Sequence, residues 1–155
     1  MDATLAAALT LRLRARGALQ PKLQLLLYPA LDASCSRRAY HEFASGFNLT
    51  AAHMQWYCNT YRGAASVDAP ELSPLASADL RAVPPAVVAV AGYDVLHHDG
   101  VEYAQRLGDA GVPVRLIRCE GMIHGFLRWT GRVPAALRCI AEITHSAREI
   151  VDGRF

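Results

Sequence analysis

The sequence lacks several features that would assign it to a large class of proteins. No apolar run approaches the ~20 residues that cross a bilayer, and the N-terminus has neither the basic region nor the cleavage site of a secretory signal peptide. Charged residues make up only 19% of the chain, and the net charge of +2 is scattered along it. These absences predict a cytoplasmic globular protein with no membrane span and no nucleic-acid partner.

Cysteine is also scarce, and its spacing excludes two kinds of site. The four cysteines include no C-x-x-C pair, which argues against a zinc site and against thioredoxin-type redox chemistry. A chain of 155 residues can bury a sizeable core without disulfides, so we expect free thiols. The adjacent His97 and His98 would diverge on any regular backbone. We therefore expect no metal and no cofactor.

The chain does contain an alternation of short apolar runs and amphipathic stretches. This pattern predicts one domain over residues 1–155 with an α/β fold: three parallel strands with flanking helices and a helical cap insert. We expect strands near 23–28, 86–91 and 113–118, and helices near 4–16, 99–110 and 134–151. Leu5, Leu9 and Leu13 recur at helical spacing, which predicts one apolar stripe on the first helix. The first strand would present an unpaired apolar edge, which is typical of half of a larger sheet.

Residues 30–72 interrupt the alternation. They are rich in aromatic residues, and Met54, Tyr57 and Tyr61 repeat at helical spacing behind Thr50, which offers a helix cap. We therefore expect an inserted helical segment rather than another unit of the sheet. Two interpretations stay open: these side chains belong to the core, or they form a lid over an apolar pocket.

Two side chains that could carry chemistry come at the predicted ends of neighbouring strands. Asp94 follows the second strand, and His124 follows the third in a loop flanked by glycines. Because the carboxyl ends of parallel strands meet at one edge of the sheet, we expect these two side chains to lie within hydrogen-bond distance, as in a Ser-His-Asp triad. Asp99 is the competing acid, although with Glu102 it is better placed to cap the next helix.

Several motifs carry a resemblance to a known family. They occur in family order over nearly the whole chain: LLLYPALD at 25–32, SPL at 73–75, GYDVL at 92–96 with DG at 99–100, AGVPV at 110–114 and GMIHGF at 121–126. The sequence resembles the C-terminal part of the α/β-hydrolase fold, in its hormone-sensitive-lipase-like carboxylesterase branch. The resemblance implies that Asp94 is the triad acid, that His124 is the triad base and that residues 33–62 belong to the cap region. The family's G-D-S-A-G nucleophile elbow and H-G-G-G oxyanion loop do not occur in these 155 residues.

The resemblance implies part of a carboxylic-ester hydrolase, with the triad acid and histidine but without the serine nucleophile and the oxyanion loop. The chain would then be a truncated gene product, the product of a misplaced start codon, or half of a split enzyme. It would act on a small-molecule ester only when a complementing chain completes it. The alternative is a non-catalytic relic, retained as a binding or regulatory subunit. A free-standing small-molecule binding module is a third hypothesis. The unpaired first strand predicts that the isolated chain is poorly soluble or forms homo-oligomers.

Overall fold

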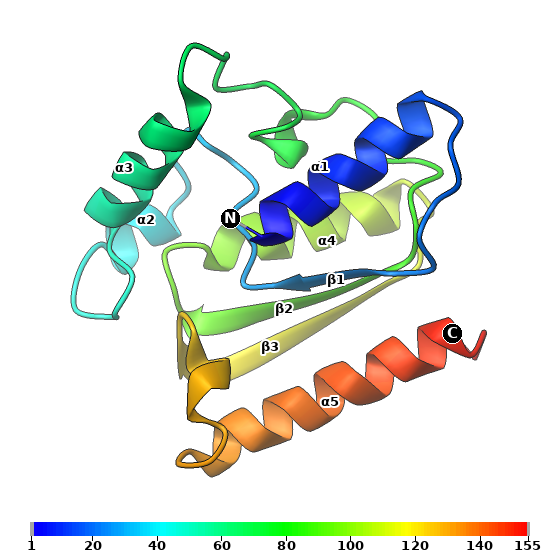
Figure 1. The fold of residues 1–155 in the computed structure, drawn as a ribbon. Helices are drawn as coiled ribbons and strands as arrows, with labels where there is room; N and C mark the ends of the chain where they lie inside the picture. The colour runs from blue at the N-terminus through cyan, green and yellow to red at the C-terminus, as the bar shows by residue number, and fades with distance from the viewer. Residues whose placement is uncertain (1, 155) are drawn as a thin grey trace.

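The computed structural model describes residues 2–154, which form one parallel sheet with helices on both faces (Figure 1). The strands lie in the order β1-β2-β3, which confirms the predicted α/β fold. No helix in the described range is long and apolar enough to span a membrane. The elements are α1 (Asp2–Ala15), β1 (Gln24–Leu27), α2 (Ala39–Glu42), α3 (Ala51–Arg62), the 3-10 turn η1 (Pro74–Ala76), β2 (Ala86–Tyr93), α4 (His97–Asp109), β3 (Val114–Ile123), the 3-10 turn η2 (Phe126–Trp129) and α5 (Pro134–Val151).

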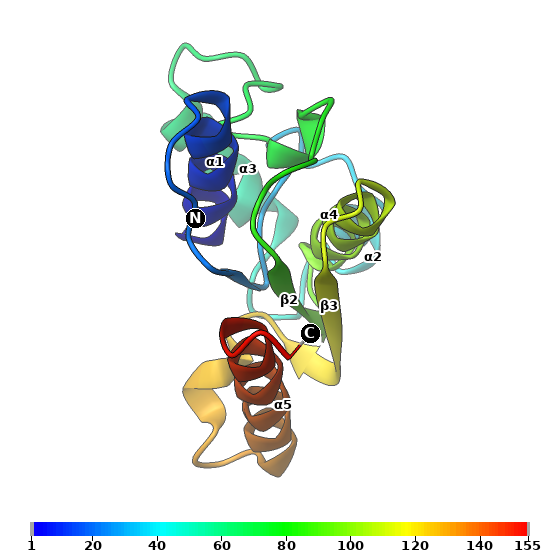
Figure 2. The same ribbon diagram turned by 90° about the vertical axis from the view of Figure 1, so that its right-hand side faces the viewer.

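The central strand β2 holds the layers together. Its residues from Ala86 to Ala91 are all buried, as an apolar strand covered on both faces must be. Because successive side chains point to opposite faces, Val88 and Val90 pack on the side of α1 and α4, while Val87 and Ala89 pack on the side of α5. Figure 2 shows α5 on the opposite side of the sheet from α1 and α4. The sheet is therefore a middle layer that fixes where its strand ends lie.

Strand β3 extends further than its apolar run predicts. It continues to Ile123, well beyond residue 118, and Ile123 pairs with Tyr93 of β2 after an irregularity in the register. The two strands consequently end side by side. The residue that follows each strand, Asp94 or His124, leaves the sheet at the same edge.

Helix α1 corrects the expectation about its leucine stripe. Leu5 and Leu9 are 48% and 52% exposed, whereas Ala7, Ala8 and Leu11 are buried. The helix lies against β1 and η1 through this small-residue face, because alanine lets a helix approach its neighbour closely. Leucine spacing identified an apolar face of the helix, but that face points away from the sheet.

The predicted insert is helical and consists of α2 and α3. The Thr50 hydroxyl accepts a hydrogen bond from the backbone N–H of His53 at 3.1 Å, so Thr50 caps α3 as expected. Met54 is buried, in a cluster that also contains Val95 and Leu96 from the turn between β2 and α4. Tyr57 and Tyr61 are exposed, so only part of the aromatic repeat joins a core. Figure 1 shows α2 and α3 beside the ends of the strands rather than over a face of the sheet.

Candidate active site

Asp94 and His124 meet at the carboxyl ends of β2 and β3. The Nδ1–H of His124 donates a hydrogen bond to Oδ2 of Asp94 at 2.7 Å. The expected contact between these two side chains is therefore confirmed, while the catalytic role of each residue stays a prediction. The contact arises because the strands are adjacent and parallel, and their last residues, Tyr93 and Ile123, pair with one another.

The Asp94 carboxylate is buried but fully hydrogen-bonded. Only 1% of the residue is exposed, and Oδ1 accepts a hydrogen bond from the backbone N–H of Leu96 at 3.0 Å. With Oδ2 held by His124, both oxygens have partners, which is the condition for keeping a charge inside a protein. This arrangement fixes the tautomer of His124, because the proton on Nδ1 is committed to Asp94. The Nε2 atom is left as the basic nitrogen.

The loop around His124 is fixed by its neighbours. Gly125 has φ +76°, a left-handed conformation that turns the chain into η2 directly after the histidine. The amide of Asn48, from the insert, donates to the carbonyl of His124 at 3.2 Å. The ring of Tyr28 packs edge-on against the imidazole, with 4.6 Å between the ring centroids. Two other segments, at Tyr28 and at Asn48, thus hold the ring and the backbone of His124.

Tyr28 is a site residue that the sequence analysis did not identify. It ends the β1 region just before Pro29, so its side chain lies at the same edge as Asp94 and His124. Burial raises the pKa of the Tyr28 phenol; the nearby Arg128 charge acts in the opposite direction, and the Asp94 charge adds to the increase. The signal that could have found it was its place directly after the first strand and before a proline.

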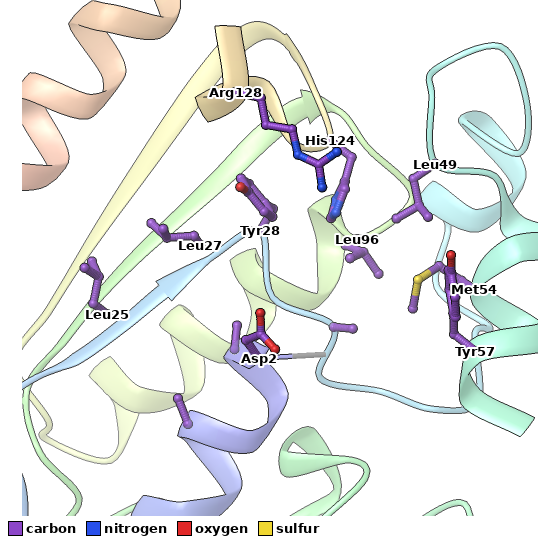
Figure 3. Close-up of a pocket in the computed structure, with 13 residues that line it drawn as sticks. Asp2, Leu25, Leu27, Tyr28, Leu49, Met54, Tyr57, Leu96, His124 and Arg128 are labelled. Carbon is purple, nitrogen blue, oxygen red and sulfur yellow. The ribbon is translucent and has the colours of Figure 1, made fainter. Parts of the chain in front are cut away.

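A cavity of about 570 Å³ opens beside His124 (Figure 3). Figure 3 shows His124 and Arg128 next to one another on one side, with Met54 and Tyr57 of α3 on another and Asp2 of α1 below. Neither serine nor cysteine occurs among the described residues that line it. The lining residues are Asp2, Ala3, Ala6, Leu25, Leu27, Tyr28, Ala30, Leu49, Met54, Tyr57, Leu96, His124 and Arg128.

Asp99 has a different place from the one expected. Helix α4 begins at His97, and Asp99 lies completely buried in its first turn instead of capping it. Its Oδ2 accepts hydrogen bonds from the backbone N–H groups of Leu31 and Asp32 at 2.9 and 3.2 Å. Burial raises the pKa of Asp99 to about 8. The helix starts earlier than predicted because the chain turns directly at the end of β2, which carries Asp99 inward to the backbone of Leu31 and Asp32, whereas Asp94 contacts His124.

The two adjacent histidines have different hydrogen-bond partners, but their side chains do not diverge as expected, because the rings pack edge to face with 5.3 Å between their centroids. His97 Nδ1 lies 2.9 Å from the carbonyl oxygen of Ala91, whereas His98 Nδ1 accepts from the backbone N–H of Ala39 at 3.1 Å. Each therefore joins α4 to a different segment. Within residues 2–154, no cluster of three or more histidine, cysteine, aspartate or glutamate side chains could hold a metal ion.

Comparison with known proteins agrees with this fold. A family model described as the alpha/beta hydrolase fold matches residues 3–128. An ethyl acetate hydrolase of Pseudomonas putida is 38% identical over 112 residues, which cover 70% of this chain and 34% of the relative. The carboxylic ester hydrolase LipN of Mycobacterium tuberculosis is 40% identical over 116 residues, which cover 74% of this chain and 31% of the relative.

A solved structure agrees along most of the chain. The thermostable esterase of Pseudomonas putida has a TM-score of 0.86 and 35% identity, over 91% of this chain and 46% of the esterase. The chain thus spans about a third to a half of the length of the relatives it matches. From the matched family model and this shared fold, we conclude that the chain belongs to the α/β-hydrolase fold family, in its hormone-sensitive-lipase-like carboxylesterase branch.

Proposed function

We propose that the chain supplies the acid and the histidine of a carboxylic-ester hydrolase. The observation that carries this proposal is the hydrogen bond between His124 and Asp94 at the C-terminal edge of the sheet. His124 Nε2 takes the proton of an attacking hydroxyl and later gives it to the departing alcohol. Asp94 holds the ring in the required tautomer and stabilises the imidazolium that forms.

The nucleophile belongs to a second segment in this proposal. That segment carries the G-D-S-A-G elbow and the H-G-G-G oxyanion loop implied by the family resemblance, and it meets the chain at the cavity beside the start of α1. Asp2, Ala3 and Ala6 support this placement, because they line the same cavity as His124. The chain covers only about a third of these two relatives, whose remaining length leaves room for such a segment.

The substrate class in this proposal is a small carboxylic ester. Apolar side chains of β1, α3 and Leu96 form much of the cavity wall, and they would bind an acyl or alkyl group. Residues 33–62 act as a cap, since Met54 and Tyr57 of this insert border the cavity. The similar proteins named as an ethyl acetate hydrolase and a carboxylic ester hydrolase support the same substrate class.

Complementation tests the proposal. The purified chain is mixed with a polypeptide that carries both motifs, and hydrolysis of p-nitrophenyl butyrate is followed. We expect turnover only when both chains are present. We expect His124→Ala to lower it on the order of 10⁶-fold and Asp94→Asn to lower it on the order of 10⁴-fold.

His145→Ala is the matched control, because His145 is an exposed histidine of α5 with only a long contact to Glu149. This variant should retain the turnover of the unmodified complex. A stable complex of the two chains without turnover would contradict the proposal. That outcome would favour a non-catalytic binding subunit derived from an esterase.

A further inference from the structure

Two of the four cysteines come together inside the insert. Cys35 lies in the loop between β1 and α2, and Cys58 lies in α3. Their sulfur atoms are 3.6 Å apart, which places the two thiols in direct contact. They share one apolar cluster with Tyr40 and Met54. Sequence spacing could not indicate this pair, because it joins two separate segments of the chain.

The contact is close enough for a bond after a small movement. A disulfide has an S–S distance of about 2.0 Å, so the two sulfur atoms must approach by about 1.5 Å. Cys35 is 7% exposed and lies between the exposed side chains of Ser34 and Ser36. Its loop is therefore at the surface, so that only a small local movement separates the buried sulfur from an oxidant in solution. Cys58 is 5% exposed and lies directly behind it.

The two thiols differ in acidity. The contact with Cys58 lowers the pKa of the Cys35 thiol to about 7, and the same contact raises the pKa of the Cys58 thiol well above its ordinary value. A thiolate is the nucleophilic form of cysteine, and Cys35 is also the member of the pair that lies in the surface loop, so Cys35 is the thiol that reacts first. A neighbouring thiol that can attack its oxidised form is the arrangement found at redox-sensitive sites.

We propose that Cys35 is a peroxide-reactive thiol that forms a reversible disulfide with Cys58. In the first step the Cys35 thiolate attacks one oxygen of hydrogen peroxide. The O–O bond breaks, one oxygen stays on the sulfur as a sulfenic acid, and the other leaves as hydroxide, which takes up a proton and becomes water. In the second step the sulfur of Cys58 attacks the sulfenic sulfur, the S–O bond breaks, and a second water leaves with the proton of Cys58. Two thiols are oxidised and one peroxide is reduced.

The disulfide would act on the wall of the cavity. Cys58 belongs to the same helix as Met54 and Tyr57, which border the cavity, and Cys35 belongs to the loop that follows Ala30, another lining residue. The bond would tie α3 to this loop and close the intervening segment into a covalent ring. It therefore restrains the insert without touching His124. This inference does not depend on the proposed ester hydrolysis.

Peptide mapping of the unmodified chain tests the inference. The chain is treated with a small molar excess of hydrogen peroxide, alkylated with iodoacetamide without reduction, and digested with trypsin. Cleavage at Lys22, Arg37 and Arg38 separates the peptide with Cys35 from the peptide with Cys58. We expect a cross-linked species of these two peptides, which dithiothreitol converts back to the separate peptides, and a higher Tm for the oxidised chain.

Two variants show which thiols react. Cys119 and Cys139 form the other contact between thiols, and C119A/C139A should leave the Cys35–Cys58 cross-link unchanged. Cys58→Ser should abolish the cross-link and leave Cys35 as a sulfenic acid that dimedone traps. The inference is overturned if peroxide leaves both thiols of the unmodified chain open to alkylation. It is also overturned if Cys35 oxidises without joining Cys58.

Discussion

Asp94 and Asp99 are both almost completely buried, yet they bond to different parts of the fold. Asp94 continues the line of β2 and reaches His124 at the strand edge. Asp99 sits one helical turn further on, and its carboxylate holds the backbone of the loop after β1 through Leu31 and Asp32. That loop begins with residues that line the cavity. Asp99 therefore stabilises the loop that lines part of the cavity, whereas Asp94 contacts His124 itself.

The protonation of Asp99 predicts a pH dependence of stability. Burial raises the pKa of this carboxyl from its ordinary 3.8 to about 8, so the folded chain holds a proton that the unfolded chain releases. Between these two values the contribution of Asp99 to the free energy of unfolding falls as pH rises, by up to about 1.4 kcal/mol per pH unit. Asp99→Asn keeps an acceptor for Leu31 and Asp32 but removes this loss. We expect the variant to gain stability relative to the unmodified chain as pH increases from 4 to 8.

Urea unfolding followed by circular dichroism at several pH values measures this difference. Asp68→Asn, in an exposed loop, controls for the change in net charge. Parallel stability curves for Asp99→Asn and the unmodified chain would show that the Asp99 carboxyl is already ionised in the folded state.

At the scale of elements, the close approach of α4 to β2 is set by one glycine. A Cβ atom added at Gly100 would overlap Cγ1 of Val90 on the central strand and would press on Pro29, 3.4 Å away. The helix can therefore lie this close to the sheet only where the side chain is missing. As a result, the first turn of α4, which contains Asp99, packs directly against β2 and Pro29 next to the site.

Two glycines of the same helix give a matched prediction. Gly100→Ala should lower the free energy of unfolding by about 1–3 kcal/mol, because the new methyl group overpacks the contact with β2. Gly108→Ala should raise it by up to about 1 kcal/mol, because alanine is favoured over glycine in the last turn of α4 as well and the new Cβ would lie at an ordinary 3.8 Å from Val114. Denaturant unfolding of both variants is the measurement. Equal effects at the two positions would contradict the packing argument.

At the scale of the whole molecule, the two edges of the sheet differ in character. The edge strand β3 carries Arg115, Arg118 and Glu120, and charged side chains of this kind discourage pairing with another strand. Strand β1 reads Gln-Leu-Leu-Leu and, within residues 2–154, pairs only with β2. Its Leu25 is 42% exposed, and the outward leucines of α1 add further exposed apolar surface to the molecule.

From the exposed apolar edge of β1, we predict that the isolated chain associates with itself. We expect its sedimentation coefficient to rise with protein concentration. Leu25→Lys should suppress the rise, because a charged side chain beside the edge opposes strand pairing. Leu19→Lys is the control, since Leu19 is 94% exposed in a loop and should not take part. A monomer at every concentration for the unmodified chain would contradict the prediction.

The sequence by itself determined the order and type of the elements. Apolar runs and amphipathic repeats placed the sheet and the three long helices, and the adjacency of parallel strand ends placed Asp94 beside His124. These features follow from local periodicity and from the geometry common to all parallel sheets, so they can be read before any contact is known.

Only the tertiary structure decided which faces and which distant side chains meet. The spacing of leucines in α1 did not predict that the face with the alanines would be buried, because both faces are apolar enough to pack against the sheet. The buried place of Asp99, the ring of Tyr28 against His124, and the contact of Cys35 with Cys58 each join segments that are far apart in sequence. Such contacts depend on how the layers come together in space, which no local repeat records.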